Sequence, residues 1–283
     1  MSLIKIVKSK SKIYKWSVDG NKYGKDYDHT VSYGFADENL IKEGYKEILA
    51  INGSLFYEYD NAFFACGVEK SRGINNQELE MDCVTKYNGC MSVACIGEEL
   101  VFCSQKWLIE NKIEECYGAI TGLGLLMSGK VRNDLHKGFE TQWDAKAKRN
   151  VIGEDIEGNI LSYIEETPIT CAALAEKVKE LGFYNALAVD GGGSIWRRYN
   201  ENYTHNTSRK VKNALILYAK DKEDEYQEKY ESLKKAYKIV LESNEELARK
   251  QKELVETVVQ YMEASKEATN KNIDDFIKMI KEV

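Results

Sequence analysis

Apolar and polar positions divide this chain into two segments with different periodicities. Up to about residue 220, short apolar runs alternate with glycines and polar turns, which is typical of β-strands. Helical spacing occurs there in few places, such as the stretch that Thr170 can cap and Gly182 can end. From residue 221 onward there is no glycine, proline, cysteine or tryptophan. We therefore expect an α+β protein, with a mixed β-sheet body and a few helices over residues 1–220 and a long helix over 221–283.

The C-terminal segment carries an alternating four-three spacing of apolar or small residues over about six heptads. The positions are Tyr226, Tyr230, Leu233, Tyr237, Val240, Leu247, Leu254, Val258, Tyr261 and Ala268. Asn244 and Gln251 interrupt the series. So long a repeat favours a coiled coil and a homo-oligomer formed through residues 222–268. Asn244 falls at an a position, where a buried amide pair favours two parallel strands. A long helix folded back on the body, or a helical hairpin, is the alternative.

Charge and cysteine content narrow the functional classes. The net charge of -6 and the isoelectric point of about 5.4 provide no basic surface for a nucleic-acid polymer. Seven cysteines form no C-x-x-C pair and no zinc-site spacing, so we expect buried free thiols in a reducing compartment. We expect no cofactor, and the need for a metal stays open.

The N-terminal residues carry lysines at positions 5, 8, 10 and 12 and no apolar signal core. No run approaches the roughly 18 apolar residues of a membrane span. We therefore expect no signal peptide and no membrane span, and a protein that is cytoplasmic or associated with a virus particle.

The stretch richest in candidate chemistry follows a short apolar run, Leu187 to Val189. Asp190 ends that run, and Gly191, Gly192, Gly193 and Ser194 come next. Consecutive glycines cost backbone entropy, so bare backbone here suggests close approach to a ligand, and exposed amides suit an anion such as phosphate. The spacing is neither a P-loop nor a dinucleotide fingerprint. A tight glycine turn between two strands is the plain alternative.

Other polar residues stand at the ends of predicted strands or in nearby loops. They are Asn52, Thr121, Arg149, Asn213 and, in a predicted polar loop over 199–209, His205 and Arg209. Arg149 leads a strand, so its guanidinium could reach a pocket. For each residue a structural role is the alternative: a turn, close packing or a solvated surface side chain.

Taken in order, these motifs resemble those of the phosphodiester glycosidases. The matching segments are Asn52-Gly53-Ser54-Leu55-Phe56, Ala119-Ile120-Thr121-Gly122, Arg149-Asn150-Val151-Ile152-Gly153, Asp190-Gly191-Gly192-Gly193-Ser194 and Lys212-Asn213-Ala214-Leu215. The resemblance covers roughly residues 45–220. It departs from the family at Ile195, where a second serine is common, and in the loop before the closing strand, which lacks proline.

The resemblance implies a hydrolase that cleaves a sugar 1-phosphodiester at the anomeric carbon and so releases the sugar from a phosphomonoester. N-acetylglucosamine is the sugar of the family's best-known member. Asp190 would stabilise positive charge at the sugar carbon or activate water. Arg149, the glycine-turn amides and Ser194 would clamp the phosphate. Asn52, Thr121 and Asn213 would hold sugar hydroxyls, and His205 and Arg209 would add contacts. Asp82 and Asp155 are possible second carboxylates, but no further feature of the sequence supports either.

Two other functions remain open. The domain could bind a phosphorylated glycan without cleaving it, as a structural component, for example of a phage particle, presented on a coiled coil. It could also hydrolyse another small phosphodiester, such as a nucleotide. The sequence leaves the sugar, the aglycone and the number of chains in the coiled coil undetermined.

Overall fold

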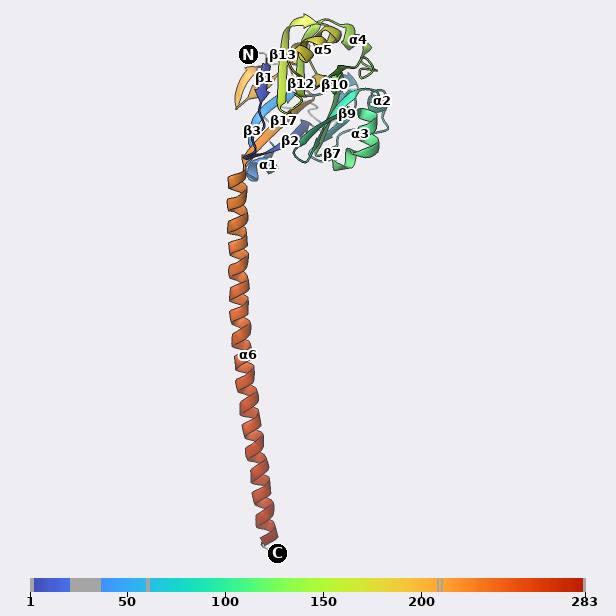
Figure 1. Cartoon of the computed structure of the whole chain (residues 1–283). Coiled ribbons are helices and arrows are strands. Elements are labelled where there is room, and N and C mark those ends of the chain that lie inside the picture. The colour runs from blue at the N-terminus through green and yellow to red at the C-terminus, as the bar shows by residue number, and fades with distance from the viewer. Residues whose placement is uncertain (1–2, 21–36, 60–61, 208, 210, 282–283) are drawn as a thin grey trace. The chain divides into compact units, whose positions relative to one another are not determined.

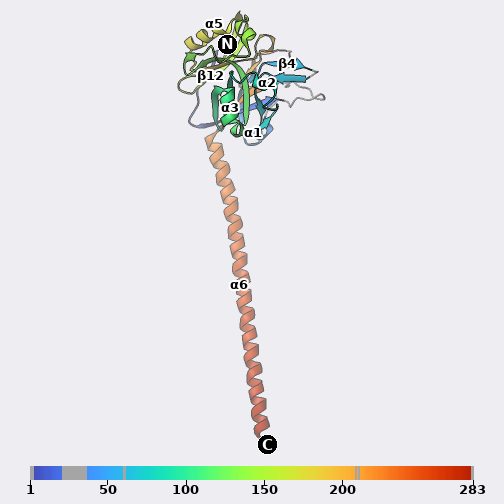
Figure 2. The ribbon, with the colours of Figure 1, turned by 90° about the vertical axis from the view of Figure 1, so that its right-hand side faces the viewer.

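The computed structural model describes residues 3–20, 37–59, 62–207, 209 and 211–281. The chain divides into two compact units, Met1–Asp224 and Glu225–Val283 (Figures 1 and 2). In the long C-terminal helix the described side chains include those of residues 229–267, so the predicted seam positions Tyr226 and Ala268 lie outside them. Among the described residues no helix is long and apolar enough to cross a membrane.

A ten-stranded antiparallel sheet makes up much of the first unit (Figure 1). Its strands are β1 (Leu3–Ile6), β6 (Glu69–Ser71), β7 (Ile74–Asn75), β8 (Met91–Ile96), β9 (Glu99–Ser104), β10 (Gly118–Met127), β11 (Lys130–Val131), β12 (Ala147–Glu154), β13 (Ile160–Ile169) and β14 (Asn185–Val189). The main path runs β1-β13-β12-β14-β10-β6-β7, with β8 and β11 also pairing with β10, and β9 with β8.

A second antiparallel sheet has five strands in the order β16-β15-β3-β17-β2, and a separate hairpin pairs β4 with β5. The strands are β2 (Lys12–Gly20), β3 (Lys46–Asn52), β4 (Phe56–Tyr59), β5 (Ala62–Ala65), β15 (Arg197–Tyr199), β16 (Asn202–His205) and β17 (Asn213–Asp221). Leucine, isoleucine and valine side chains of β3, β10, β14 and β17 share one buried cluster with Trp16, so the two sheets pack face to face.

The helices are few and mostly short. They are α1 (Glu38–Lys42), α2 (Asp82–Thr85), α3 (Gln105–Asn111), α4 (Glu140–Asp144), α5 (Cys171–Glu180) and α6 (Lys222–Lys281), with 3₁₀ turns at Ile113–Glu115 and Gly192–Ser194. α5 packs Leu174 and Val178 against a second cluster on the ten-stranded sheet. Thr170 Oγ1 accepts the α5 N-cap hydrogen bond from Ala173 N at 3.3 Å, as predicted. The α+β prediction is confirmed.

The predicted polar loop over 199–209 is wrong in its first half, because β15 and β16 form a hairpin there. Its two turn residues, Asn200 and Glu201, both have positive φ (47° and 65°). This is typical of a type I′ turn, which usually contains glycine. The absence of that glycine hid the hairpin, and His205 therefore ends a strand rather than lying in a loop.

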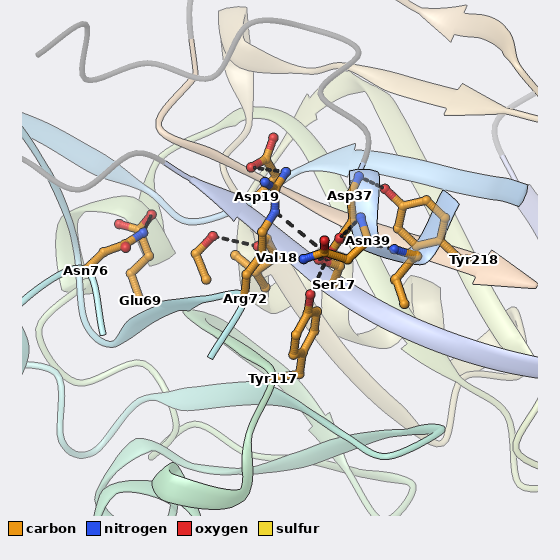
Figure 3. A network of polar contacts seen from close by, with 12 residues as sticks. Ser17, Val18, Asp19, Asp37, Asn39, Glu69, Arg72, Asn76, Tyr117 and Tyr218 are labelled. Atoms are coloured by element: carbon orange, nitrogen blue, oxygen red, sulfur yellow. Dashed lines mark hydrogen bonds and ion pairs between the residues drawn. The ribbon is translucent and has the colours of Figure 1, made fainter. Parts of the chain in front are cut away.

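A buried polar network ties β2 to the start of α1 and to the β6–β7 turn (Figure 3). Asp37 accepts hydrogen bonds from the Ser17 hydroxyl at 3.0 Å and the Tyr117 hydroxyl at 2.7 Å. Arg72 forms an ion pair with Asp19 at 2.9 Å. Burial raises the pKa of Asp19 to about 6, against the effect of the Arg72 charge. No sequence motif announced this network, because its members are far apart in the chain.

Asp155 closes the turn between β12 and β13. Its carboxylate accepts hydrogen bonds from the backbone of Glu157 and Asn159, each at 2.9 Å, and pairs with Lys5 at 2.8 Å. Burial acts to raise its pKa, but the bonds from Lys5, Asn159 and the turn amides outweigh this and lower it to about 2. Asp155 is therefore engaged in structure and is not the second carboxylate of a catalytic pair.

Replacing Asp155 by Asn should lower the melting temperature by a few degrees at pH 7, since lost charge-assisted hydrogen bonds cost about 1–3 kcal/mol. The pKa is depressed in the folded state, so the carboxylate stabilises the fold above its ordinary pKa of about 4. The difference between variant and parent should shrink as pH falls from about 4 towards 2. Asp134→Asn, which removes an exposed pair with Arg132, is the control and should change little. Thermal melts of both variants between pH 2 and 7 test this. Equal effects of the two substitutions would contradict the structural role of Asp155.

Candidate functional site

The glycine turn lies where the ends of strands from both sheets meet. Asn52, the last residue of β3, donates from Nδ2 to the Asp190 carbonyl at 2.6 Å. In return Asp190 N donates to the Gly53 carbonyl at 2.9 Å. These two bonds join the chain after β3 to the chain after β14, and so they fix the position of Asp190.

Asn150, which the sequence analysis did not single out, belongs to the same cluster. Its Nδ2 donates to Asn52 Oδ1 at 2.9 Å, and that oxygen also accepts from Trp196 N at 2.9 Å. Asn150 pairs in register with Val189, directly before Asp190. The Asn150 Oδ1 atom is buried and accepts no hydrogen bond from any described residue. This neighbourhood of Asp190 is thus polar, buried and not fully satisfied.

Arg149 is not where the phosphate clamp needs it, which corrects the expectation drawn from the resemblance. Its neighbour Asn150 points to Asn52, and successive strand residues point to opposite faces. The Arg149 side chain is buried and donates to the backbone carbonyls of Ile169 (3.3 Å), Gln142 (2.7 Å) and Ala145. Its guanidinium therefore holds α4 and the end of β13 in place.

Asp190 is half-buried at the head of the glycine turn. Burial raises its pKa, while the nearby Ser194 hydroxyl, the positive charge of Arg209 and the Gly191 amide, which donates to Oδ1 at 3.0 Å, act in the opposite direction. Ser194 Oγ is buried and lies outside hydrogen-bonding geometry with every described residue. A carboxyl group whose pKa is pushed upward beside an unsatisfied hydroxyl is a candidate for proton transfer.

Two of the three glycines have a structural reason to lack a side chain, and the third has none. A Cβ at Gly191 would lie 2.5 Å from the Lys148 carbonyl oxygen. Gly192 has a φ of +57°, which disfavours residues with a side chain. A Cβ at Gly193 would meet no heavy atom within 4 Å. Gly192 and Gly193 are both exposed, so the turn offers bare backbone to solvent.

A pocket of about 230 Å³ opens beside this turn. Its lining consists of Lys148, Ile164, Glu166, Gly192, Gly193, Ile195, His205, Asn206 and Thr207. His205 Nε2 lies 2.9 Å from Glu166 Oε1, and Thr207 Oγ1 donates to the Gly193 carbonyl at 2.6 Å. The structure thus brings three predicted residues, Gly192, Gly193 and His205, to one hollow, and adds Lys148 and Glu166.

Of the remaining predicted residues, Thr121 and Asn213 are buried and hydrogen-bonded within the fold, and Arg209 is exposed. The Thr121 hydroxyl is fully engaged by Ser92 (2.7 Å) and Gln105 (2.8 Å) in a buried cluster. Asn213 is also buried, and its Oδ1 accepts from Ser54 N at 2.8 Å. Neither is free to hold a sugar hydroxyl without rearrangement. Arg209 is exposed, with its guanidinium 5.4 Å from the Phe56 ring centroid.

All seven cysteines are buried free thiols. Cys66 lies close enough to Asp190 to feel its charge, but burial, the larger effect, raises the Cys66 pKa to about 11. A thiol with so high a pKa is a poor nucleophile. Among the described residues no three His, Cys, Asp or Glu side chains are grouped as metal ligands would be.

The site thus consists of a carboxylate that directly follows strand β14, an exposed glycine turn and a polar pocket beside that turn. The sequence profile of the phosphodiester glycosidases matches residues 45–218, and the chain belongs to this family. The resemblance seen in the sequence is thereby confirmed.

Solved structures similar to this chain include the zebrafish N-acetylglucosamine-1-phosphodiester alpha-N-acetylglucosaminidase catalytic domain, auto-inhibited by its pro-peptide. It shares 17% identity over 72% of each chain, with a TM-score of 0.48. A hypothetical protein from Synechocystis shares 11% identity over 75% of this chain and 57% of its own, also with a TM-score of 0.48. No curated protein sequence matches the chain.

The glycine turn predicts a contrast between two single substitutions. Gly191→Ala should lower the free energy of unfolding by about 1–3 kcal/mol, because its Cβ overlaps backbone that cannot step aside. Gly193→Ala has room and should leave stability within about 0.5 kcal/mol of the parent. Denaturant unfolding of both variants tests this. Equal stability of the two would show that the turn is not packed against Lys148 as described.

Proposed function

We propose that this protein hydrolyses a sugar 1-phosphodiester at the anomeric carbon. The observation that carries the proposal is the half-buried Asp190 at the head of an exposed glycine turn, beside a polar pocket, in a chain of the phosphodiester glycosidase family. In the proposed reaction water adds to the sugar C1, and the bond between C1 and the phosphate oxygen breaks. The products are the free sugar and a phosphomonoester of the second alcohol.

The leaving group explains why one well-placed carboxylate could suffice. Most glycosidases use two carboxyl groups, one of which protonates a poor alkoxide leaving group. A phosphomonoester leaves as a stable anion, so proton donation contributes less and charge stabilisation contributes more. In this scheme Asp190 in its ionised form faces the sugar carbon, where it stabilises positive charge or takes a proton from water.

The phosphate would be bound by the glycine turn and by the exposed cations Lys148 and Arg209 rather than by Arg149. Gly192 and Gly193 present unobstructed backbone at the pocket, and Lys148 lines the same hollow. Arg209 is near enough to Asp190 for its charge to oppose the larger effect of burial, which raises the Asp190 pKa. The His205–Glu166 pair stands at the pocket, where it would contact the alcohol beyond the phosphate.

Asp190→Asn should reduce turnover by about a thousandfold, because general-base and charge-stabilising roles are commonly worth that much. The fold should survive, since Asn keeps an oxygen for the Gly191 amide. Release of sugar from a panel of synthetic sugar 1-phosphodiesters, read by mass spectrometry, measures this. Asp134→Asn serves as the surface control. Full turnover in the Asp190 variant would remove Asp190 from the mechanism.

Lys148→Ala should lower kcat/KM about tenfold or more and lower kcat as well, because the phosphate gains negative charge as it leaves and the lysine contact then strengthens. Lys146→Ala removes a neighbouring lysine that does not line the pocket and is the matched control. An unchanged kcat/KM for the Lys148 variant, with the control normal, would place the phosphate elsewhere.

Binding of a phosphorylated glycan without hydrolysis is the second candidate function. It is favoured by the engagement of both predicted catalytic partners of Asp190 in structure: Arg149 donates to backbone carbonyls and Asp155 accepts from a turn. The carboxylate that does line the pocket, Glu166, is paired with His205. Saturable binding of a substrate that is never consumed would support it. Hydrolysis of a nucleotide phosphodiester in the same panel would instead identify a different substrate class.

A further inference from the structure

Helix α6 carries a row of large apolar side chains that nothing covers within the described part of the chain. From residue 229 to 267 every described side chain of the helix is exposed. The exposed fraction of the apolar ones runs from 43% at Leu241 to 77% at Tyr261. A helix with so much apolar surface in water is expected to bury that surface against a partner.

Apart from Ile239 and Val259, the large apolar residues of this stretch fall into three neighbouring columns of the heptad abcdefg, in which Asn244 takes position a. Column d contains Leu233, Val240, Leu247, Leu254 and Tyr261. Column a contains Tyr230, Tyr237, Asn244, Gln251 and Val258. Column e contains Lys234, Leu241, Ala248, Val255 and Met262. Column e is therefore apolar from residue 241 to 262, although charged residues usually occupy it in two-stranded coiled coils.

The width of this face indicates how many helices cover it. Two helices in a coiled coil bury mainly columns a and d, whereas helices of larger bundles present a third column to the core. The other flank, column g, is small or hydroxylated at Ala236, Ser243, Thr257 and Ala264, with one lysine at Lys250. Small flanking residues allow further helices to approach closely.

The two amides in column a favour copies of the same chain as the partners. In a parallel, in-register assembly Asn244 meets Asn244 and Gln251 meets Gln251, so each amide finds a hydrogen-bond partner. Against an antiparallel copy or an unrelated apolar helix these amides would face apolar side chains and lose their partners.

The charged residues outside columns a, d and e do not require a different protein as a partner either. Several pair within the helix at one-turn spacing: Lys238–Glu242 (3.9 Å), Lys250–Glu246 (2.7 Å), Arg249–Glu253 (3.9 Å) and Lys252–Glu256 (3.9 Å). The face itself offers no block of one charge to attract an oppositely charged protein.

We propose that three or more copies of this chain associate in parallel and in register through columns a, d and e of α6. This replaces the two-stranded assembly that Asn244 alone favours. It is independent of the proposed hydrolysis, because it uses no residue of the first unit.

Sedimentation equilibrium of the full chain tests the proposal directly. The expected mass is at least three times the 32.3 kDa of one chain. Leu247→Asp with Leu254→Asp should return it to a single chain. A parent mass of one or two chains would overturn the proposal.

The third column needs its own test. Leu241→Lys with Val255→Lys should lower the assembled mass, since these residues would be buried in a larger bundle. Ile239→Lys with Val259→Lys makes the same chemical change at columns c and b, off the face, and should leave the mass unchanged. Retention of the full mass by the column-e variant would overturn the three-column interface.

Disulfide trapping tests orientation. Under mild oxidation Asn244→Cys should crosslink chains to one another, whereas Ile239→Cys on the opposite side of the helix should not. An uncrosslinked Asn244→Cys chain in an assembly of the expected mass would exclude the parallel register.

Discussion

The buried amide of Asn52 is the contact on which this site depends. Its oxygen receives Asn150 of the larger sheet and the backbone of Trp196, and its nitrogen holds the Asp190 carbonyl. Strand ends from two sheets are thus tied at one point. A buried amide that makes three hydrogen bonds holds its neighbours rigidly, because displacement leaves polar groups unsatisfied in a dry interior.

Much of this arrangement could be predicted from the sequence, because it depends on local chemistry. The apolar run before Asp190, the glycines after it, the Thr170 cap and the long glycine-free helix are each written in a few adjacent residues. The sequence could not, however, predict which of two neighbours, Arg149 or Asn150, turns its side chain towards the site. β12 is buried on both faces, so apolar and polar positions do not alternate to show which side chains face the site. The Asp19–Asp37–Arg72 network was missed for another reason: only tertiary pairing brings its members together.

The buried carboxylates differ in how completely their surroundings satisfy them. Asp155 is held ionised by donors on every side, with its pKa at about 2, and Asp37 is fully buried and receives hydrogen bonds from hydroxyl and backbone groups. Groups so completely satisfied stabilise the fold but have no capacity left for a substrate. Asp190 differs, because its burial opposes ionisation and its surroundings include the Ser194 hydroxyl, which is outside hydrogen-bonding geometry with the described residues. Reactive groups in proteins are commonly the ones whose environment leaves such a conflict.

The central claim is that the bond broken lies between the sugar carbon and oxygen, and not between phosphorus and oxygen. Hydrolysis of a sugar 1-phosphodiester in water enriched in ¹⁸O distinguishes the two, with mass spectrometry of the phosphomonoester product as the readout. The account predicts a phosphomonoester free of the label, because water attacks carbon. Incorporation of ¹⁸O into the phosphomonoester would contradict it, because water would then have attacked phosphorus.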